Sequence, residues 1–208
     1  MATAIPSIAC LGVIGRNNNP LHITVFPSYD AVTNIRAPLR TSLQFSLLLS
    51  STLDVFEARA RRSAAPQTAS GGAGTPILSG DYGLLHAVDE RLAAYGFETN
   101  TGVKFVAVVD MRGRLPPGGM VSGGGAPGVG AGGRGGVGLR EAELRVVFRA
   151  MQTAYVRLLQ NPFYDPDEHA PLVPAGGAGA GGKRITSRKF AEEMRRIGEN
   201  WAPGVTSL

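Results

Sequence analysis

The stretch that most constrains the fold is Lys104–Asp110, which reads Lys-Phe-Val-Ala-Val-Val-Asp. Five of its seven residues are apolar, and most of these are aromatic or β-branched. Gly102 precedes the stretch and Gly113 follows it. A short apolar run with such boundaries is typical of a strand that is buried on both faces. Other segments of the chain must therefore cover both faces of this strand.

Four further segments predict strands beside it. Ser7–Gly15 is another nearly continuous apolar run and predicts a second interior strand. Leu21–Phe26 alternates between apolar and other residues, so it predicts a strand with one more exposed face that forms a hairpin with the first. Tyr82–Glu90 and Leu92–Glu98 predict two more strands, which form a meander with Lys104–Asp110.

Three segments predict helices, because their apolar residues recur at helical spacing. The first is Leu39–Ala60, and Pro38 is well placed to begin it. The second is Leu139–Gln160. The third is Ser187–Trp201, with Ser187 as the expected N-cap.

The resulting order, ββαβββαα, predicts an α+β fold with one five-stranded, mostly antiparallel sheet. We expect the first helix to cover one face of the sheet and the last two helices to cover the other. The 208 residues suit a single domain, 1–208. Segments 61–76, 111–138 and 169–185 are rich in Gly, Ala, Ser or Pro, so we expect them to be disordered inserts.

Composition narrows the class of protein. The chain has 21 Lys and Arg against 16 Asp and Glu, which gives a net charge of +5. Many of these cations lie in or beside the inserts, so the charge does not indicate a nucleic-acid-binding face. The one cysteine, Cys10, excludes an internal disulfide and fits a reducing compartment. No targeting segment stands out, and the most apolar stretch, Phe45–Phe56, is too short and too interrupted to span a membrane. These features predict a cytoplasmic protein that reaches membranes only through partners.

Two glycine-rich matches suggest nucleotide or RNA binding. Gly177–Lys183 fits the phosphate-binding pattern G-x-x-x-x-G-K, but position 184 is Arg where a Ser or Thr should hold magnesium, and no strand precedes the match. Arg134 lies in a Gly-Gly-Arg-Gly-Gly segment, but one arginine without aromatic neighbours can neutralise few phosphates. A nucleotide-using enzyme and an RNA binder therefore remain alternatives of a different class.

No pattern predicts a metal or catalytic site. The acidic cluster Asp165, Asp167 and Glu168 lacks the glycine and glutamate that a calcium loop needs. The histidines, His22, His86 and His169, lack metal-ligand spacing. No Ser or Cys lies in a known nucleophile motif. We therefore expect no catalytic residue, no cofactor and no metal.

Four short motifs, in this order along the chain, resemble the sedlin family. They are Ser51–Val55 (Ser-Thr-Leu-Asp-Val), Tyr95–Asn100 (Tyr-Gly-Phe-Glu-Thr-Asn), the Lys104–Asp110 strand and Asn161–Pro166 (Asn-Pro-Phe-Tyr-Asp-Pro). The chain departs from the family in exchanging Ser and Thr in the first motif, in Asp165 where the family has Asn, and in the three inserts. The likeness covers nearly all residues outside the inserts.

The resemblance implies a longin-like (SNARE-like) fold and a non-catalytic adaptor or scaffold subunit of the TRAPP vesicle-tethering complex. It implies partners among the other TRAPP subunits, with a Rab GTPase served indirectly by the nucleotide exchange activity of the assembly, and a location at ER–Golgi and Golgi membranes. The sedlin subunit itself is the alternative within the same class. Asp54 matches a family aspartate at a subunit contact, which makes it the candidate partner-interface residue; an ordinary solvated helix carboxylate is the other reading.

Overall fold

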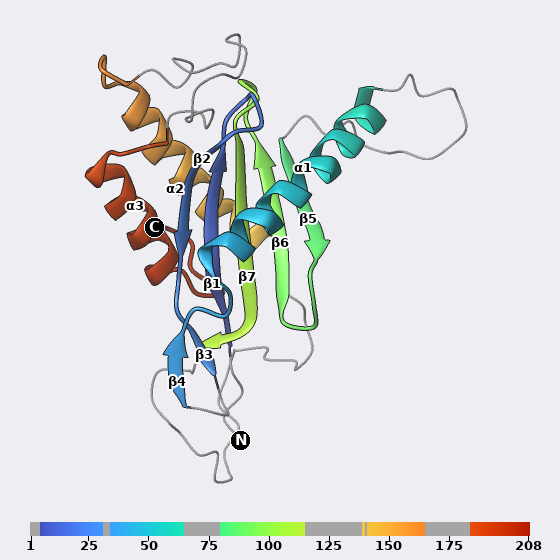
Figure 1. Ribbon diagram of the computed structural model, residues 1–208, viewed down its shortest axis with the longest axis vertical. Helices are drawn as coiled ribbons and strands as arrows, with labels where there is room; N and C mark the ends of the chain where they lie inside the picture. The colour runs from blue at the N-terminus through green and yellow to red at the C-terminus, as the bar shows by residue number, and fades with distance from the viewer. Residues whose placement is uncertain (1–4, 31–33, 65–79, 115–138, 140, 165–183) are drawn as a thin grey trace.

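The computed structural model describes residues 5–30, 34–64, 80–114, 139, 141–164 and 184–208 (Figure 1). Their strands are β1 (Ile5–Ile14), β2 (Pro20–Val25), β3 (Ser28–Asp30), β4 (Ile35–Ala37), β5 (Asp81–Ala87), β6 (Leu92–Glu98) and β7 (Lys104–Arg114). Their helices are α1 (Ser42–Ala64), α2 (Glu141–Leu159) and α3 (Arg188–Asn200).

The main sheet has five strands in the order β2-β1-β7-β6-β5, and every neighbouring pair is antiparallel. Helix α1 crosses one face of the sheet, and α2 and α3 lie on the other face (Figure 1). The predicted α+β architecture, with one helix in front and two behind, is therefore confirmed.

Strand β7 lies at the centre of the sheet, as the sequence predicts. Its residues Lys104–Asp110 are all buried. Phe105, Ala107 and Val109 face the α2–α3 layer, whereas Val106 and Val108 face α1. The alternation of side chains along a strand splits one apolar run between two cores.

Several boundaries differ from the sequence-based prediction. Helix α1 begins at Ser42, not at Leu39, because Thr41 and Gln44 form a reciprocal cap: the Thr41 N–H donates to Gln44 Oε1 at 2.9 Å and the Gln44 N–H to Thr41 Oγ1 at 3.3 Å. Strand β5 ends at Ala87, not at Glu90, because the Asp89 carboxylate accepts the N–H groups of Arg91 and Leu92 and forms a turn.

The insert boundaries also shift. Residues 61–64 belong to α1 and residues 111–114 to β7, so these ends of the expected inserts 61–76 and 111–138 are regular structure. At the end of the insert expected at 169–185, Ile185 is buried and its N–H donates to the Leu21 carbonyl at 2.9 Å. Arg184, beside it, is exposed, and the remaining insert residues lie outside the described part of the chain.

The small hairpin β3–β4 has no counterpart in the prediction. Its strands have three residues each, and every residue of β4 is exposed. Such short, exposed strands carry no hydrophobic period that sequence reasoning could use.

Candidate protein-binding surface

Helix α1 has one face against the sheet and one face toward solvent. The buried face carries Phe45, Leu48, Leu49, Thr52 and Phe56. The solvent face carries Leu43, Leu47, Ser50 and Asp54, which follow the spacing i, i+4, i+7, i+11 and so form one stripe. We call these four residues the outer stripe of α1.

Two large apolar side chains of the outer stripe are unusually exposed. Leu43 is 70% exposed and Leu47 is 64% exposed. Single exposed apolar residues are common, but two on adjacent turns of one helix form a small apolar patch. Because the opposite face of α1 already packs on the sheet, this patch is available for contact with another molecule.

Asp54 lies at the C-terminal end of the outer stripe and is exposed. Within the described residues, no hydrogen bond or ion pair holds its carboxylate. An exposed carboxylate on the same helix face as an apolar patch can pair with a cation of a partner. The structure places Asp54 on the surface; whether a partner contacts it stays a prediction.

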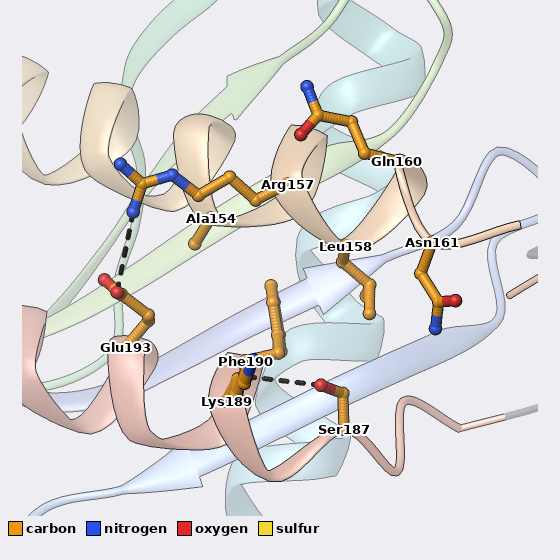
Figure 2. Close-up of a pocket in the computed structure, with 9 residues that line it drawn as sticks. All are labelled: Ala154, Arg157, Leu158, Gln160, Asn161, Ser187, Lys189, Phe190 and Glu193. Carbon is orange, nitrogen blue, oxygen red and sulfur yellow. Dashed lines mark hydrogen bonds and ion pairs between the residues drawn. The ribbon is translucent and has the colours of Figure 1, made fainter.

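A groove of about 490 Å³ lies between the end of α2 and the start of α3 (Figure 2). Ser187 Oγ accepts the Phe190 N–H at 3.4 Å and so caps α3, as the sequence predicts. Arg157 and Glu193 form an ion pair across the groove at 3.6 Å. The ion pair thus links the two helices, and the Ser187 hydroxyl is engaged in capping α3.

Two side chains of high intrinsic reactivity, Cys10 and His22, are sheltered by packing. Burial raises the pKa of the Cys10 thiol, so this cysteine acts as a small buried hydrophobe. Burial also lowers the pKa of His22, whose ring packs edge-on against Phe190 and whose Nε2 shares a 2.7 Å hydrogen bond with Thr24 Oγ1. His86 is exposed on β5. His22 is therefore a packed neutral side chain, not the outward-facing residue that the alternation of the strand indicates.

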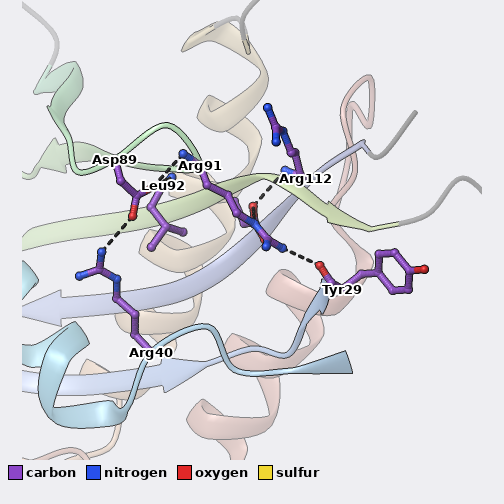
Figure 3. A network of polar contacts seen from close by, with 7 residues as sticks. Tyr29, Arg40, Asp89, Arg91, Leu92 and Arg112 are labelled. Carbon is purple, nitrogen blue, oxygen red and sulfur yellow. Dashed lines mark hydrogen bonds and ion pairs between the residues drawn. The ribbon is translucent and has the colours of Figure 1, made fainter. Parts of the chain in front are cut away.

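A buried ion pair lies at the end of the sheet where β7 contacts the hairpin β3–β4 (Figure 3). The Asp110 side chain is fully buried; it accepts hydrogen bonds from Arg91 Nε at 2.8 Å, from Arg91 Nη2 at 2.9 Å and from the Arg112 N–H at 2.9 Å. Arg91 Nη2 also donates to the carbonyl of Tyr29 in β3, and the bonded Asp110 raises the Arg91 pKa. Sequence reasoning treats Asp110 as the end of a strand and misses this pair.

The network has an exposed extension at the turn between β5 and β6. Arg40 Nη2 lies 2.9 Å from Asp89 Oδ2, and the same carboxylate organises the turn (Figure 3). The pairs join the segment before α1, the hairpin β3–β4 and the centre of the sheet. Because they connect segments that are distant in sequence, we assign them a role in folding.

Among the described residues, no group of three or more His, Cys, Asp or Glu side chains could hold a metal ion. No helix in the same part of the chain is both long and apolar enough to cross a bilayer. The glycine-rich matches Gly177–Lys183 and Arg134, the acidic cluster at 165–168 and His169 lie outside the described residues.

A sequence model of the Sedlin family matches residues 13–200. A protein of Dictyostelium discoideum named trafficking protein particle complex subunit 2-like protein is 22% identical over 191 residues, which cover 91% of this chain and 95% of that protein. A Mus musculus protein of the same name is 26% identical over 181 residues, which cover 87% of this chain and 89% of the mouse protein.

Proposed function

This chain belongs to the Sedlin family, and from that premise we propose that it is a non-catalytic adaptor subunit of a trafficking protein particle (TRAPP) complex. Family membership supports the broader role, that of a subunit of a trafficking complex. The match extends over most of this chain and most of each relative, so the proposal concerns the whole protein and not a shared module.

The observation that carries the proposal is the outer stripe of α1. Leu43 and Leu47 remain exposed at one end of a helix whose other face is buried, and Asp54 adds a carboxylate two turns further on. Exposed apolar side chains together with a charged group on the same face are typical of a protein-binding surface. The stripe therefore supports contact with another subunit.

In this proposal the chain assists assembly, and the assembled complex promotes nucleotide exchange on a Rab GTPase in ER–Golgi and Golgi transport. The protein is cytoplasmic and reaches those membranes through its partner subunits. No catalytic residue, cofactor or metal of this chain takes part. The sedlin subunit itself stays the alternative within the class.

The test replaces Asp54 by tyrosine and measures capture of recombinant TRAPP subunits by the purified chain. A bulky ring at the rim of the stripe should weaken capture by about tenfold, which corresponds to about 1.4 kcal/mol. The melting curve of the isolated variant should match that of the wild type, since the position is exposed.

The matched control is Glu192→Tyr, which makes the same change at an exposed acidic position of α3, on the other side of the sheet. Equal capture by wild type and Asp54→Tyr would remove Asp54 from the interface. Failure of the wild-type chain to capture any TRAPP subunit would refute the proposed function itself.

A further inference from the structure

Strand β2 forms one edge of the main sheet, and its outer side is largely open. Residues Ala9 and Phe26 face each other, and the Phe26 N–H donates to the Ala9 carbonyl at 2.9 Å. In an antiparallel pair, bonded and non-bonded positions alternate, so the backbone groups of Ile23 and Val25 point away from β1. Within the described part of the chain, nothing pairs with them.

The structure already uses this edge once. Ile185 lies just before α3, and its N–H donates to the outward carbonyl of Leu21 at 2.9 Å. The backbone just before α3 therefore already makes one hydrogen bond to the outward side of β2. This bond shows that the N–H of another segment can reach an outward carbonyl of the strand.

The two edge strands of the sheet, β2 and β5, differ in how their outward backbone groups are covered. At the opposite edge, the guanidinium of Arg59 in α1 donates to the carbonyls of Tyr82 and Leu84 in β5. Strand β2 has no Lys, Arg, Asp or Glu, and its only proline stands at its first position. Proteins usually protect an exposed edge with charges, prolines or cover, because bare edges pair with other chains. Apart from Ile185 at one end, the described residues give the open side of β2 no such protection.

A groove of about 410 Å³ runs beside the open edge, between β2 and the start of α1. Ile23, Leu43 and Ile185 supply apolar walls, and Leu43 is 70% exposed. Arg184 is the one charged residue among the residues that line it, and the first turn of α1 has no acidic residue. The groove therefore favours an apolar side chain followed by a carboxylate.

A second copy of this chain fits the edge poorly. If two β2 strands paired about a two-fold axis through Thr24, the outer side of each Leu21 would face residue 27 of the other copy. That space is taken by Ile185, so only Ile23 and Val25 of each strand could pair. A flexible peptide can pair with the same two residues and also follow the groove past Leu43.

We propose that the open edge of β2 is a second binding site, which takes an extended segment of another protein by strand addition. The segment pairs with the backbone of Ile23 and Val25, places an apolar side chain against Leu43 and directs a carboxylate to Arg184. Main-chain bonds supply affinity and the groove supplies selectivity, as in other strand-addition sites. The site goes beyond the proposed function. It shares Leu43 with the outer stripe of α1 but uses neither Leu47 nor Asp54.

The test follows the amide signals of the full-length chain by nuclear magnetic resonance, with two synthetic peptides of about eight residues. Both alternate valine and threonine; one carries glutamate near one end, and the other has lysine at that position. The glutamate peptide should shift the amides of Ile23 and Val25 and slow their hydrogen exchange. It should bind about tenfold more tightly than the lysine peptide.

Ile23→Pro removes an N–H that points away from β1, so it should abolish binding of the glutamate peptide while the fold persists. The matched variant Ile23→Val keeps the N–H and should bind like the wild type. Arg184→Glu changes an exposed residue and should reverse the preference between the two peptides. This charge reversal tests the site even if the proline variant unfolds.

Three results would overturn the inference. The first is that neither peptide shifts the two amides at any concentration reached. The second is that the amides are already protected in the free wild-type chain, which would mean that the chain closes its own edge. The third is that the wild type sediments as a dimer that Ile23→Pro dissociates, which would make a second copy the occupant. Since the assay contains no TRAPP subunit, its outcome is separate from that of the proposed function.

Discussion

The buried pair Arg91–Asp110 allows a quantitative prediction for Asp110→Ala. The substitution removes a carboxylate that accepts three hydrogen bonds and leaves the Arg91 guanidinium and the Arg112 N–H without that partner. Removal of one member of a buried pair costs about 3–5 kcal/mol. Because the Arg91 side chain is 28% exposed, water can solvate part of it, and we expect the low end, about 3 kcal/mol.

Urea unfolding followed by circular dichroism measures this loss from the midpoint and slope of the transition. For a chain of this size, a loss of about 3 kcal/mol lowers the melting temperature by roughly 6 to 12 °C. Asp54→Ala is the control, since an exposed carboxylate without a described partner should change stability by no more than about 0.5 kcal/mol.

The double variant Asp110→Leu with Arg91→Met should recover most of the loss, because an apolar pair leaves no uncompensated charge. If Asp110→Ala costs less than about 1 kcal/mol, the pair does not hold the lower end of the sheet together, and our account of the network is wrong.

Two further predictions concern buried side chains. Because burial raises the pKa of Cys10, a maleimide reagent at pH 8 should leave the folded chain unlabelled and should modify it fully in urea. Rapid labelling without urea would show that the core around β1 opens to solvent in the folded chain. Burial lowers the pKa of His22 below its ordinary value of 6.5, so the unfolded chain binds the proton more strongly, and stability should fall as the pH drops below about 6.5. His22→Gln should flatten that part of the stability curve, and an unchanged slope would assign the acid sensitivity to other groups.

Hydrophobic period predicts the elements that carry the core. The segment Leu92–Glu98 forms β6 with the predicted bounds, and the three helices differ from their predicted bounds by at most a few residues. These elements bury whole faces, so their sequences repeat at the spacing of the structure. The layer arrangement follows from the order of elements and the two-sided burial of β7.

What sequence reasoning misses depends on polar contacts between distant residues. Asp110 and Arg91 lie 19 positions apart, and no local pattern pairs them. The turn at Asp89 depends on one carboxylate that accepts two backbone N–H groups, a role that the sequence Asp-Glu-Arg does not distinguish from a solvated surface. The open edge of β2 likewise follows from strand order, which the sequence leaves open.

The candidate site is predictable only in part. A resemblance to the sedlin family selects Asp54, and the structure places it on an exposed helix face. The exposure of Leu43 and Leu47 agrees with the helical period, because both lie off the face that carries Phe45, Leu48 and Leu49. The period does not show how much of each side chain stays uncovered once the helix packs on the sheet.

The most direct test of a subunit that assembles through α1 is hydroxyl-radical footprinting of the chain, alone and mixed with recombinant TRAPP subunits. Leu43 and Leu47 are 70% and 64% exposed in the free chain, so their oxidation is readily measured. We predict that the chain enters the assembly and that oxidation of both leucines falls by about tenfold, while oxidation of Phe163, which is 91% exposed beyond the end of α2, stays unchanged. Entry into the assembly with both leucines as reactive as before would contradict the assignment of the outer stripe, and a chain that stays apart from every subunit would contradict the account as a whole.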